Sequence, residues 1–173
     1  MSPDHFKSFE SQRLWLRPTS IADAEFILEL FNSPKWLQHI GDRNIFSVAD
    51  AKHYIVHKMH PQFQQLGFGN YTILTKTNNL KVGICGLYDR EGLEGIDIGF
   101  ALLPQFEGQG YALEACITLQ RAAREVFAIT DLKGITTKVN KPSQAILLKM
   151  GLRYRHDIKL TKDGETLMLF AEK

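Results

Sequence analysis

The residues with the clearest chemical meaning are Gly108 and Gly110, which lie between an apolar strand pattern and a long amphipathic helix pattern. Glycine has no Cβ atom, so a ligand can approach the backbone closely at these positions. The first turn of a helix also carries unpaired N–H groups and the positive end of the helix dipole. A strand, a glycine turn and a helix start in this order favour phosphate binding.

The spacing of these glycines separates the known kinds of phosphate loop. The chain has no G-x-x-x-x-G-K-[ST] run, and Leu113 stands where a dinucleotide-binding G-x-G-x-x-G sequence needs its third glycine. The pattern that remains is Gln105-x-x-Gly108-x-Gly110. Two alternative interpretations stay open, which are an ordinary strand-to-helix turn and a nucleotide-binding domain that uses the same loop.

Asp97 is a second candidate for chemistry, because it interrupts the otherwise apolar strand pattern at residues 96–103. An acid in apolar surroundings is costly unless it is paired or functional. The sequence therefore predicts either a salt bridge, a solvent-facing position or a catalytic role for this carboxylate.

Neither the cysteines nor the histidines predict a metal site. Cys85 and Cys116 lie in apolar patterns without a metal-binding spacing, so we expect buried, reduced thiols. His53, His57 and His60 share one face of a helix pattern, but no zinc signature accompanies them. We therefore expect solvated histidines and no bound metal.

Composition and charge narrow the class of protein. The 173-residue chain is 44% hydrophobic and 23% charged, as in a soluble globular domain, and its net charge is only +2. No block of Lys and Arg is present, which disfavours nucleic-acid binding, and no run of ~18 apolar residues could span a membrane. Residues 1–5 do not begin a signal peptide, so we expect a cytoplasmic location by default.

The elements that must position these residues follow the order β-α-α-β-β-β-α-β-α-β-β. We expect strands at residues 13–17, 70–76, 81–88, 95–103, 134–139, 154–160 and 165–171, and helices at 20–32, from 47 onwards, at 111–127 and at 143–150. The segment 35–46 is expected to be irregular. This order predicts a single mixed α/β domain over residues 1–173, with a largely antiparallel, twisted sheet of about seven strands flanked by about four helices.

Two further motifs give this element order a family likeness. Residues 140–152 have the form N-x-x-S…K-x-G-L, and the first predicted strand reads R-L-W-L-R-P. Together with the glycine pattern, these motifs resemble the GNAT N-acetyltransferases. The opening strand is similar to that of the Rim-type subfamily, which includes enzymes that acetylate the N-termini of ribosomal proteins. The resemblance covers residues 13–171.

The resemblance implies an acetyl-CoA-dependent N-acetyltransferase in which an amine attacks the thioester directly, in a ternary complex and without a metal. The loop 105–112 would bind the pyrophosphate through main-chain N–H groups. The strand ending at Leu103 would diverge from its neighbour and pair with pantetheine, and a main-chain N–H within residues 100–102 would polarise the acetyl carbonyl. The implied cofactor-binding residues are Phe100, Ala101, Leu102, Leu103, Gln105, Phe106, Glu107, Gly108, Gln109, Gly110, Tyr111, Ala112, Asn140, Ser143 and Lys149.

The resemblance also implies catalytic residues. Asp97 stands at the acid position of the subfamily's E-I-G-[YF] pattern and would be the general base, with Glu91 and Glu94 as alternatives. A free α-amine has a pKa near ~7.7–8.0, so a carboxylate acting through water would suffice. Ser143 would hydrogen-bond to or protonate the leaving thiolate, or else cap the short helix. Many family members use a tyrosine at the position of Leu147, so that route is excluded here.

Other assignments leave alternatives open. Asn140 would tie down the strand end or a cofactor group, or cap a helix. Trp36, Leu37 and His39 would contact the acceptor, or simply pack. The acceptor could be a protein N-terminus, a polyamine, an amino acid or an aminoglycoside-like amine, and a pocket rich in acids would favour a cationic one. The rival function is a non-catalytic acyl-CoA-binding or sensing module, and the protein would be a monomer or a homodimer.

Overall fold

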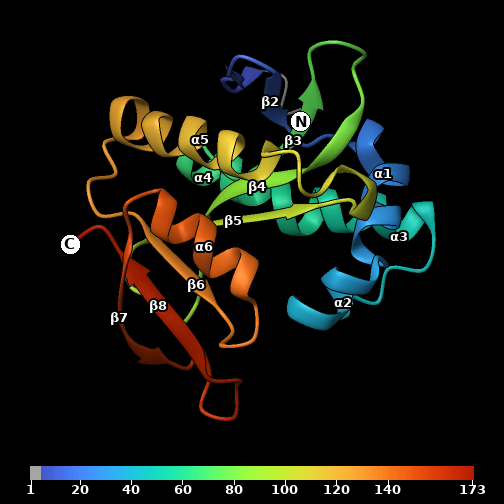
Figure 1. The fold of residues 1–173 in the computed structure, drawn as a ribbon. Coiled ribbons are helices and arrows are strands. Elements are labelled where there is room, and N and C mark those ends of the chain that lie inside the picture. Colours follow the sequence, from blue (N-terminus) through green and yellow to red (C-terminus); the bar gives the residue numbers. More distant parts are fainter. Residues whose placement is uncertain (1–4) are drawn as a thin grey trace.

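An eight-stranded sheet forms the centre of the molecule (Figure 1). The computed structural model describes residues 5–173, so residues 1–4, part of the segment that predicts no signal peptide, lie outside the described residues. The strand order is β1-β2-β3-β4-β5-β6-β8-β7, and all neighbours are antiparallel except β5 and β6. The strands are β1 (Phe9–Glu10), β2 (Leu14–Pro18), β3 (Asn70–Thr75), β4 (Lys81–Asp89), β5 (Ile96–Leu102), β6 (Lys133–Thr136), β7 (Arg153–Ile158) and β8 (Leu167–Ala171).

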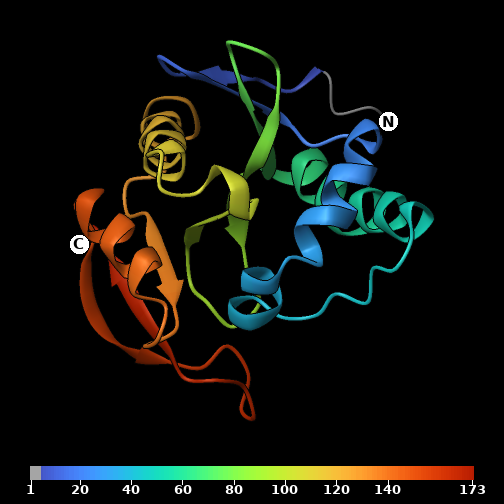
Figure 2. The same ribbon diagram turned by 45° about the vertical axis from the view of Figure 1, so that its right-hand side comes forward.

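Helices cover both faces of this sheet, as the two views in Figures 1 and 2 show. The α-helices are α1 (Ala24–Phe31), α2 (Pro34–His39), α3 (Val48–Tyr54), α4 (His60–Leu66), α5 (Tyr111–Phe127) and α6 (Lys141–Lys149). Helix α5 packs on β4 and β5 and contributes to the larger apolar cluster. Helices α1, α2 and α3 form a second cluster with Ile84 and Leu103. The candidate site lies between the larger apolar cluster and this second cluster.

The predicted fold class is confirmed, because the structure is mixed α/β with a largely antiparallel sheet. Helix α5 spans the residues expected from its apolar spacing and its glycine start. Two elements were not expected. The two-residue strand β1 is too short to show an alternation, and α2 forms where an irregular segment was expected. Helix α2 starts with Ser33 at its N-cap and Pro34 in its first turn, which suits a helix start because proline lacks an N–H.

The predicted second helix is divided by a π-helical segment, η3 (Ile55–Met59), which joins α3 to α4. Pro61 follows this segment and cannot donate a backbone hydrogen bond, which favours a local break in the helical pattern. His60, the first residue after this segment, lies inward, with its Nε2 3.1 Å from the carbonyl oxygen of Thr19. His60 is therefore buried rather than solvated, and it does not share an exposed face with His53 and His57.

The R-L-W-L-R-P motif builds a buried ion pair beside the sheet. Arg17 contacts Asp23 through Nη1 to Oδ2 and through Nη2 to Oδ1, each at 2.7 Å. Lys81 Nζ lies 2.8 Å from Asp23 Oδ1. Burial by itself raises the pKa of Asp23, but hydrogen bonds from Arg17, Lys81 and the Ser20 N–H outweigh it and lower the pKa to about 2.

Asp23 should make the stability of the protein fall in acid. Because its pKa is lower in the folded protein (about 2) than in the unfolded chain (3.8), the unfolded state binds the proton more tightly. Its stabilisation is present above about pH 4, is lost as the pH falls towards 2, and amounts to about 2 kcal/mol. We expect urea unfolding at a series of pH values to show this loss in the wild type and not in Asp23→Asn. Equal pH dependence in both proteins would contradict the assignment.

Candidate active site

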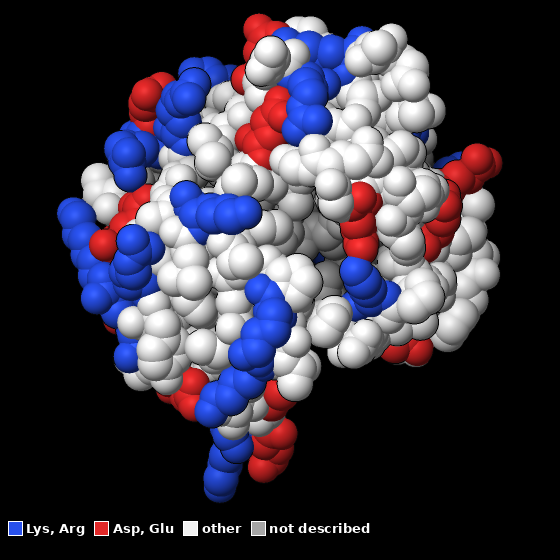
Figure 3. Space-filling model, viewed as in Figure 1, with Lys and Arg blue, Asp and Glu red and all other residues white. Residues whose placement is uncertain are grey.

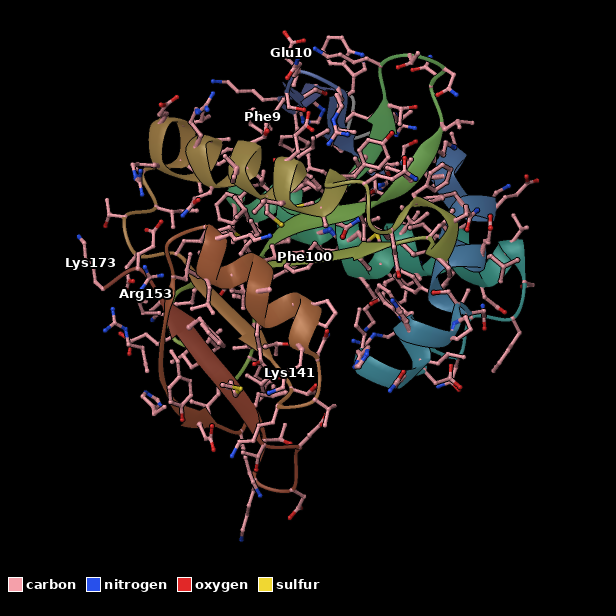
Figure 4. All side chains as sticks on the ribbon, viewed as in Figure 1. Phe9, Glu10, Phe100, Lys141, Arg153 and Lys173 are labelled. Atoms are coloured by element: carbon pink, nitrogen blue, oxygen red, sulfur yellow. The ribbon has the colours of Figure 1, made fainter. Side chains whose placement is uncertain are left out.

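A slot between β5 and β6 forms the centre of the candidate site. The two strands run parallel and pair only at Asp97 and Lys133, so the β5 edge at residues 98–102 faces no strand. A cavity of about 970 Å³ occupies this region and is lined by both strands, by the start of α5 and by residues of α2 and α6. Figure 3 shows its opening as a hollow between the side of the molecule with α6 and the side with α2. Phe100, labelled in Figure 4, belongs to the lining.

The loop before α5 has the backbone geometry of an anion site. Gly108 and Gly110 have φ angles of 75° and 81°, in the left-handed region that favours glycine. The first helical hydrogen bond runs from the Glu114 N–H to the Gly110 carbonyl at 3.1 Å. The N–H groups of residues 111–113 therefore have no partner within the described chain and lie at the positive end of the helix dipole.

Arg13, which is distant in sequence from the glycine loop, contacts the loop and the first turn of α5. Its Nε lies 2.6 Å from Glu114 Oε2, and its Nη1 donates to the Gln109 carbonyl at 2.9 Å. The guanidinium also lies 4.6 Å from the centre of the Tyr111 ring. From the sequence, Arg13 was recognised only as part of a motif. Its position as the first arginine of R-L-W-L-R-P was the only indication of a role at the site.

The cavity brings together most of the predicted cofactor-binding residues, namely Phe100, Ala101, Leu102, Glu107, Gly108, Gly110, Tyr111, Ala112, Asn140, Ser143 and Lys149. Four others do not line it. Leu103 is buried in the cluster of α1–α3, and its N–H donates to the Val82 carbonyl at 2.9 Å. Phe106 packs against both apolar clusters, and Gln105 and Gln109 are exposed, with the Gln105 carbonyl accepting a hydrogen bond from Gln109 Nε2.

Asp97 is buried and paired at the α1–α3 end of the cavity. Its side chain is 1% exposed, and its Oδ1 accepts a hydrogen bond of 2.7 Å from Arg90 Nε. Its Oδ2 has no hydrogen-bond partner among the described residues. Burial raises the pKa of Asp97, and the charge of Arg90 offsets only part of this effect. The alternatives Glu91 and Glu94 are exposed and lie outside the cavity lining.

Tyr88 fixes the guanidinium of Arg90 over the sheet. Gly86 and Gly99 face each other on β4 and β5, and a Cβ on either would lie within 3 Å of the Tyr88 ring. The ring therefore lies flat over two glycines, with Arg90 4.7 Å from its centre. The Tyr88 hydroxyl donates to Asn70 Oδ1, which anchors the ring at its other end. Sequence reasoning missed both Tyr88 and Arg90.

Asn140 and Ser143, at the start of α6, have different roles. Asn140 Oδ1 accepts a hydrogen bond of 3.3 Å from the Ser143 N–H, so Asn140 is the N-cap of the helix. The Ser143 Oγ has no hydrogen bond within residues 5–173 and lines the cavity. Leu147 is 1% exposed and packs against Gly134, so an apolar side chain stands where many of the resembled acetyltransferases have a tyrosine.

Helix α2 supplies the remaining wall. The Trp36 ring stacks on Phe31 at 3.8 Å between centroids, and both residues line the cavity together with His39. Trp36 Nε1 and His39 Nδ1 are buried without a hydrogen-bond partner in the described structure. Leu37 is exposed and does not line the cavity. Lys35 forms an ion pair with Glu107, which joins α2 to the glycine loop.

Within residues 5–173, no group of three or more His, Cys, Asp or Glu side chains is placed to hold a metal ion. The rings of His53 and His57 lie 4.1 Å apart, whereas His60 points into the core. None of the described helices is long and apolar enough to cross a membrane.

Comparisons with known proteins agree on one family and one fold. The sequence model of the acetyltransferase (GNAT) domain matches residues 13–153. RimL, a ribosomal α-N-protein acetyltransferase solved in complex with coenzyme A, superposes with a TM-score of 0.81 at 19% identity, over 95% of this chain and 97% of that chain. An acetyltransferase from Agrobacterium tumefaciens gives a TM-score of 0.79 at 21% identity, over 95% and 93% of the two chains.

A ribosomal-protein alanine acetyltransferase from Vibrio fischeri gives a TM-score of 0.75 at 15% identity, over 95% of each chain. At identities this low, the structural likeness concerns the fold. The match to the family model, which extends from β2 to the start of β7, is the evidence for common family membership.

Proposed function

Because the chain belongs to the family of acetyltransferase (GNAT) domains, it is an acyltransferase that uses acetyl-CoA, and we propose that it transfers the acetyl group to a primary amine by direct attack in a ternary complex. The observation that carries this proposal is the open slot between β5 and β6, which meets the unpaired N–H groups at the start of α5. The acceptor would be a protein N-terminus or a small-molecule amine.

The residues of the slot fit an extended thioester with a diphosphate at one end. Acetyl-CoA supplies an activated acyl group when it is bound. Gly108 and Gly110 line the cavity, and a Cβ placed on Gly108 would meet nothing within 4 Å, so the loop leaves room for a diphosphate to approach the backbone N–H groups. Lys149 adds a positive charge to the cavity lining. The free edge of β5 offers main-chain hydrogen bonds to an extended amide chain, and an N–H within residues 100–102 would stabilise the charge that develops on the acetyl oxygen.

Two side chains would handle the protons of the reaction. Asp97 Oδ2 would accept the proton of the attacking amine, directly or through a water molecule, because it is the free oxygen of a buried carboxylate in the cavity lining. A raised pKa makes this carboxylate a stronger base than an exposed aspartate. Ser143 Oγ would donate a hydrogen bond or proton to the leaving thiolate.

Calorimetric titration with acetyl-CoA, CoA, ATP and NAD, followed by an assay of amine-dependent thiol release, tests the proposal. We expect selective micromolar binding of acetyl-CoA and release of CoA thiol only when an amine is present. Preference for ATP or NAD would instead indicate a nucleotide-binding domain. Tight binding of acetyl-CoA without turnover of any amine would favour a non-catalytic binding or sensing module.

A further inference from the structure

We propose that the acceptor amine carries a carboxylate a few bonds from its nitrogen, and that Arg90, Lys58 and Arg43 recognise this carboxylate. The inference rests on the proposed function, because it names the class of amine that the site takes. It is the opposite of the cationic acceptor that an acid-rich pocket would have indicated.

The charge around the α1–α3 end of the cavity is mainly positive. Lys58 comes from η3, Arg43 from the segment between α2 and α3, and Arg90 follows β4, and all three line the cavity. Neither Lys58 nor Arg43 forms an ion pair with a described residue. The acids that line the cavity are Asp97, which already pairs with Arg90, Glu107, which pairs with Lys35, and Glu165. The net excess of positive charge attracts anions and repels polycations.

The guanidinium of Arg90 is fixed in a position that leaves its outer edge available. Asp97 takes the Nε hydrogen, and no other hydrogen bond ties the two Nη groups to the described residues. The side chain is 33% exposed and stacks on the Tyr88 ring. The two Nη groups of an arginine form a fork that matches the two oxygens of a carboxylate. The ordered fork therefore offers a carboxylate site at little further cost in side-chain entropy.

This fork lies next to the backbone proposed to hold the acetyl group. Arg90 Nη2 is 3.4 Å from the place where a Cβ on Gly99 would stand. Gly99 lies on the open edge of β5, immediately before residues 100–102, one of whose N–H groups is proposed to bind the acetyl oxygen, and consecutive Cα atoms are ~3.8 Å apart. A carboxylate on Arg90 would thus be a few bonds from an amine that attacks in the slot.

An independent observation concerns a hydrogen-bond donor in the lining of the same cavity. Trp36 Nε1 is buried without a partner and its residue lines the cavity. An indole nitrogen can only donate, so this orphaned group needs an oxygen from a bound molecule or from water. A carboxylate that accepts two hydrogen bonds from Arg90 still has lone pairs that could accept a hydrogen bond from Trp36 Nε1.

Matched pairs of acceptors test the inference. We would measure kcat/KM with free amino acids and their amides, and with peptides that begin with Asp or Asn or carry either residue second. Within a pair, the two acceptors differ in a carboxylate or a carboxamide, and kcat/KM is expressed per unprotonated amine because this group also changes the pKa of a neighbouring α-amine. We expect the carboxylate form to be preferred by about tenfold or more, which corresponds to ~1.4 kcal/mol. The pair with the larger preference distinguishes a free amino acid from an acidic peptide end.

Variants connect this preference to the named residues. We expect Lys58→Gln and Arg43→Gln each to reduce the carboxylate preference severalfold, and Arg90→Gln to abolish it. Lys52→Gln is the matched control, because Lys52 is an exposed lysine of α3 outside the cavity lining. The preference is a ratio of two acceptors measured on one protein, so a general loss of catalysis in Arg90→Gln cancels.

The outcomes separate the two proposals. Acetylation with no preference for the carboxylate form, or with a polyamine as the best acceptor, would overturn the inference and leave the proposed function intact. Equal effects of Lys58→Gln and Lys52→Gln would overturn the assignment of Lys58. Absence of acetyl transfer to every amine, in a protein that remains folded, would overturn the proposed function itself.

Discussion

Replacing Asp97 by Asn is expected to lower kcat by about 10²-fold or more at neutral pH, with the affinity for acetyl-CoA unchanged. The amide keeps the size of the side chain but cannot accept the proton of the amine. Since Asp97 faces the α1–α3 side of β5 and the phosphate loop lies at the start of α5, the substitution leaves the cofactor loop intact. Steady-state kinetics and calorimetric titration of the same preparation measure the two quantities.

The pH profile gives this prediction a second measurement. Burial raises the pKa of Asp97. As the pH is lowered, kcat of the wild type should therefore decline at a pH above the pKa of an ordinary aspartate, because the base becomes protonated. The Asn variant should lack this decline. Its deficit should also shrink above about pH 8, where a free α-amine is already deprotonated.

Controls keep the effect of Asp97→Asn distinct from damage to the fold. The substitution leaves the partly buried Arg90 without its counter-charge, so some loss of unfolding free energy is expected. Asp97→Glu keeps the charge and should retain more activity than Asp97→Asn. Asp157 is another strand aspartate in an ion pair, with Lys138, and neither residue lines the cavity. Asp157→Asn should therefore change neither kcat nor the affinity for acetyl-CoA. Full activity in Asp97→Asn would remove Asp97 from the mechanism.

Replacing Gly108 by Ala is expected to weaken acetyl-CoA binding by at least about tenfold, or ~1.4 kcal/mol. The new Cβ would meet no protein atom within 4 Å, and because Gly108 lines the cavity we expect the Cβ to occupy space that the diphosphate would use. It would thereby block close approach of the diphosphate to the backbone N–H groups. Titration calorimetry measures the affinity directly.

Gly67 provides a closely matched control for this variant. It has a φ of 82° against 75° for Gly108, and a Cβ on it would also meet nothing within 4 Å. Both Ala variants should therefore lose about 1–2 kcal/mol of unfolding free energy through left-handed backbone strain. Only Gly108→Ala should lose cofactor affinity, because Gly67 does not line the cavity. Equal affinities in the two variants would show that the loop is a structural turn.

The sequence by itself determined the elements whose signals are local. The bounds of α5 follow from apolar spacing at the helical period and from the glycines before it, and the capping box of Ser20 and Asp23 marks the start of a helical segment. The same local patterns predict the order of helices and strands along the chain, and with it the mixed α/β fold class. Motifs at residues 13–18, 105–112 and 140–152 were sufficient for the family, because each combines fixed residue types with a predicted element.

Only the tertiary structure decided which distant side chains meet at the site. Arg13 contacts Glu114 across 101 positions of sequence, and Trp36 reaches the cavity through a helix that the pattern did not predict. Arg90 meets Asp97 because the chain turns back between β4 and β5, and the Tyr88 ring can lie between Arg90 and the sheet because two glycines face each other there. Such contacts depend on strand register and on the paths of loops, which produce no periodic pattern in the sequence. The positive charge around the α1–α3 end of the cavity therefore became visible only in the fold.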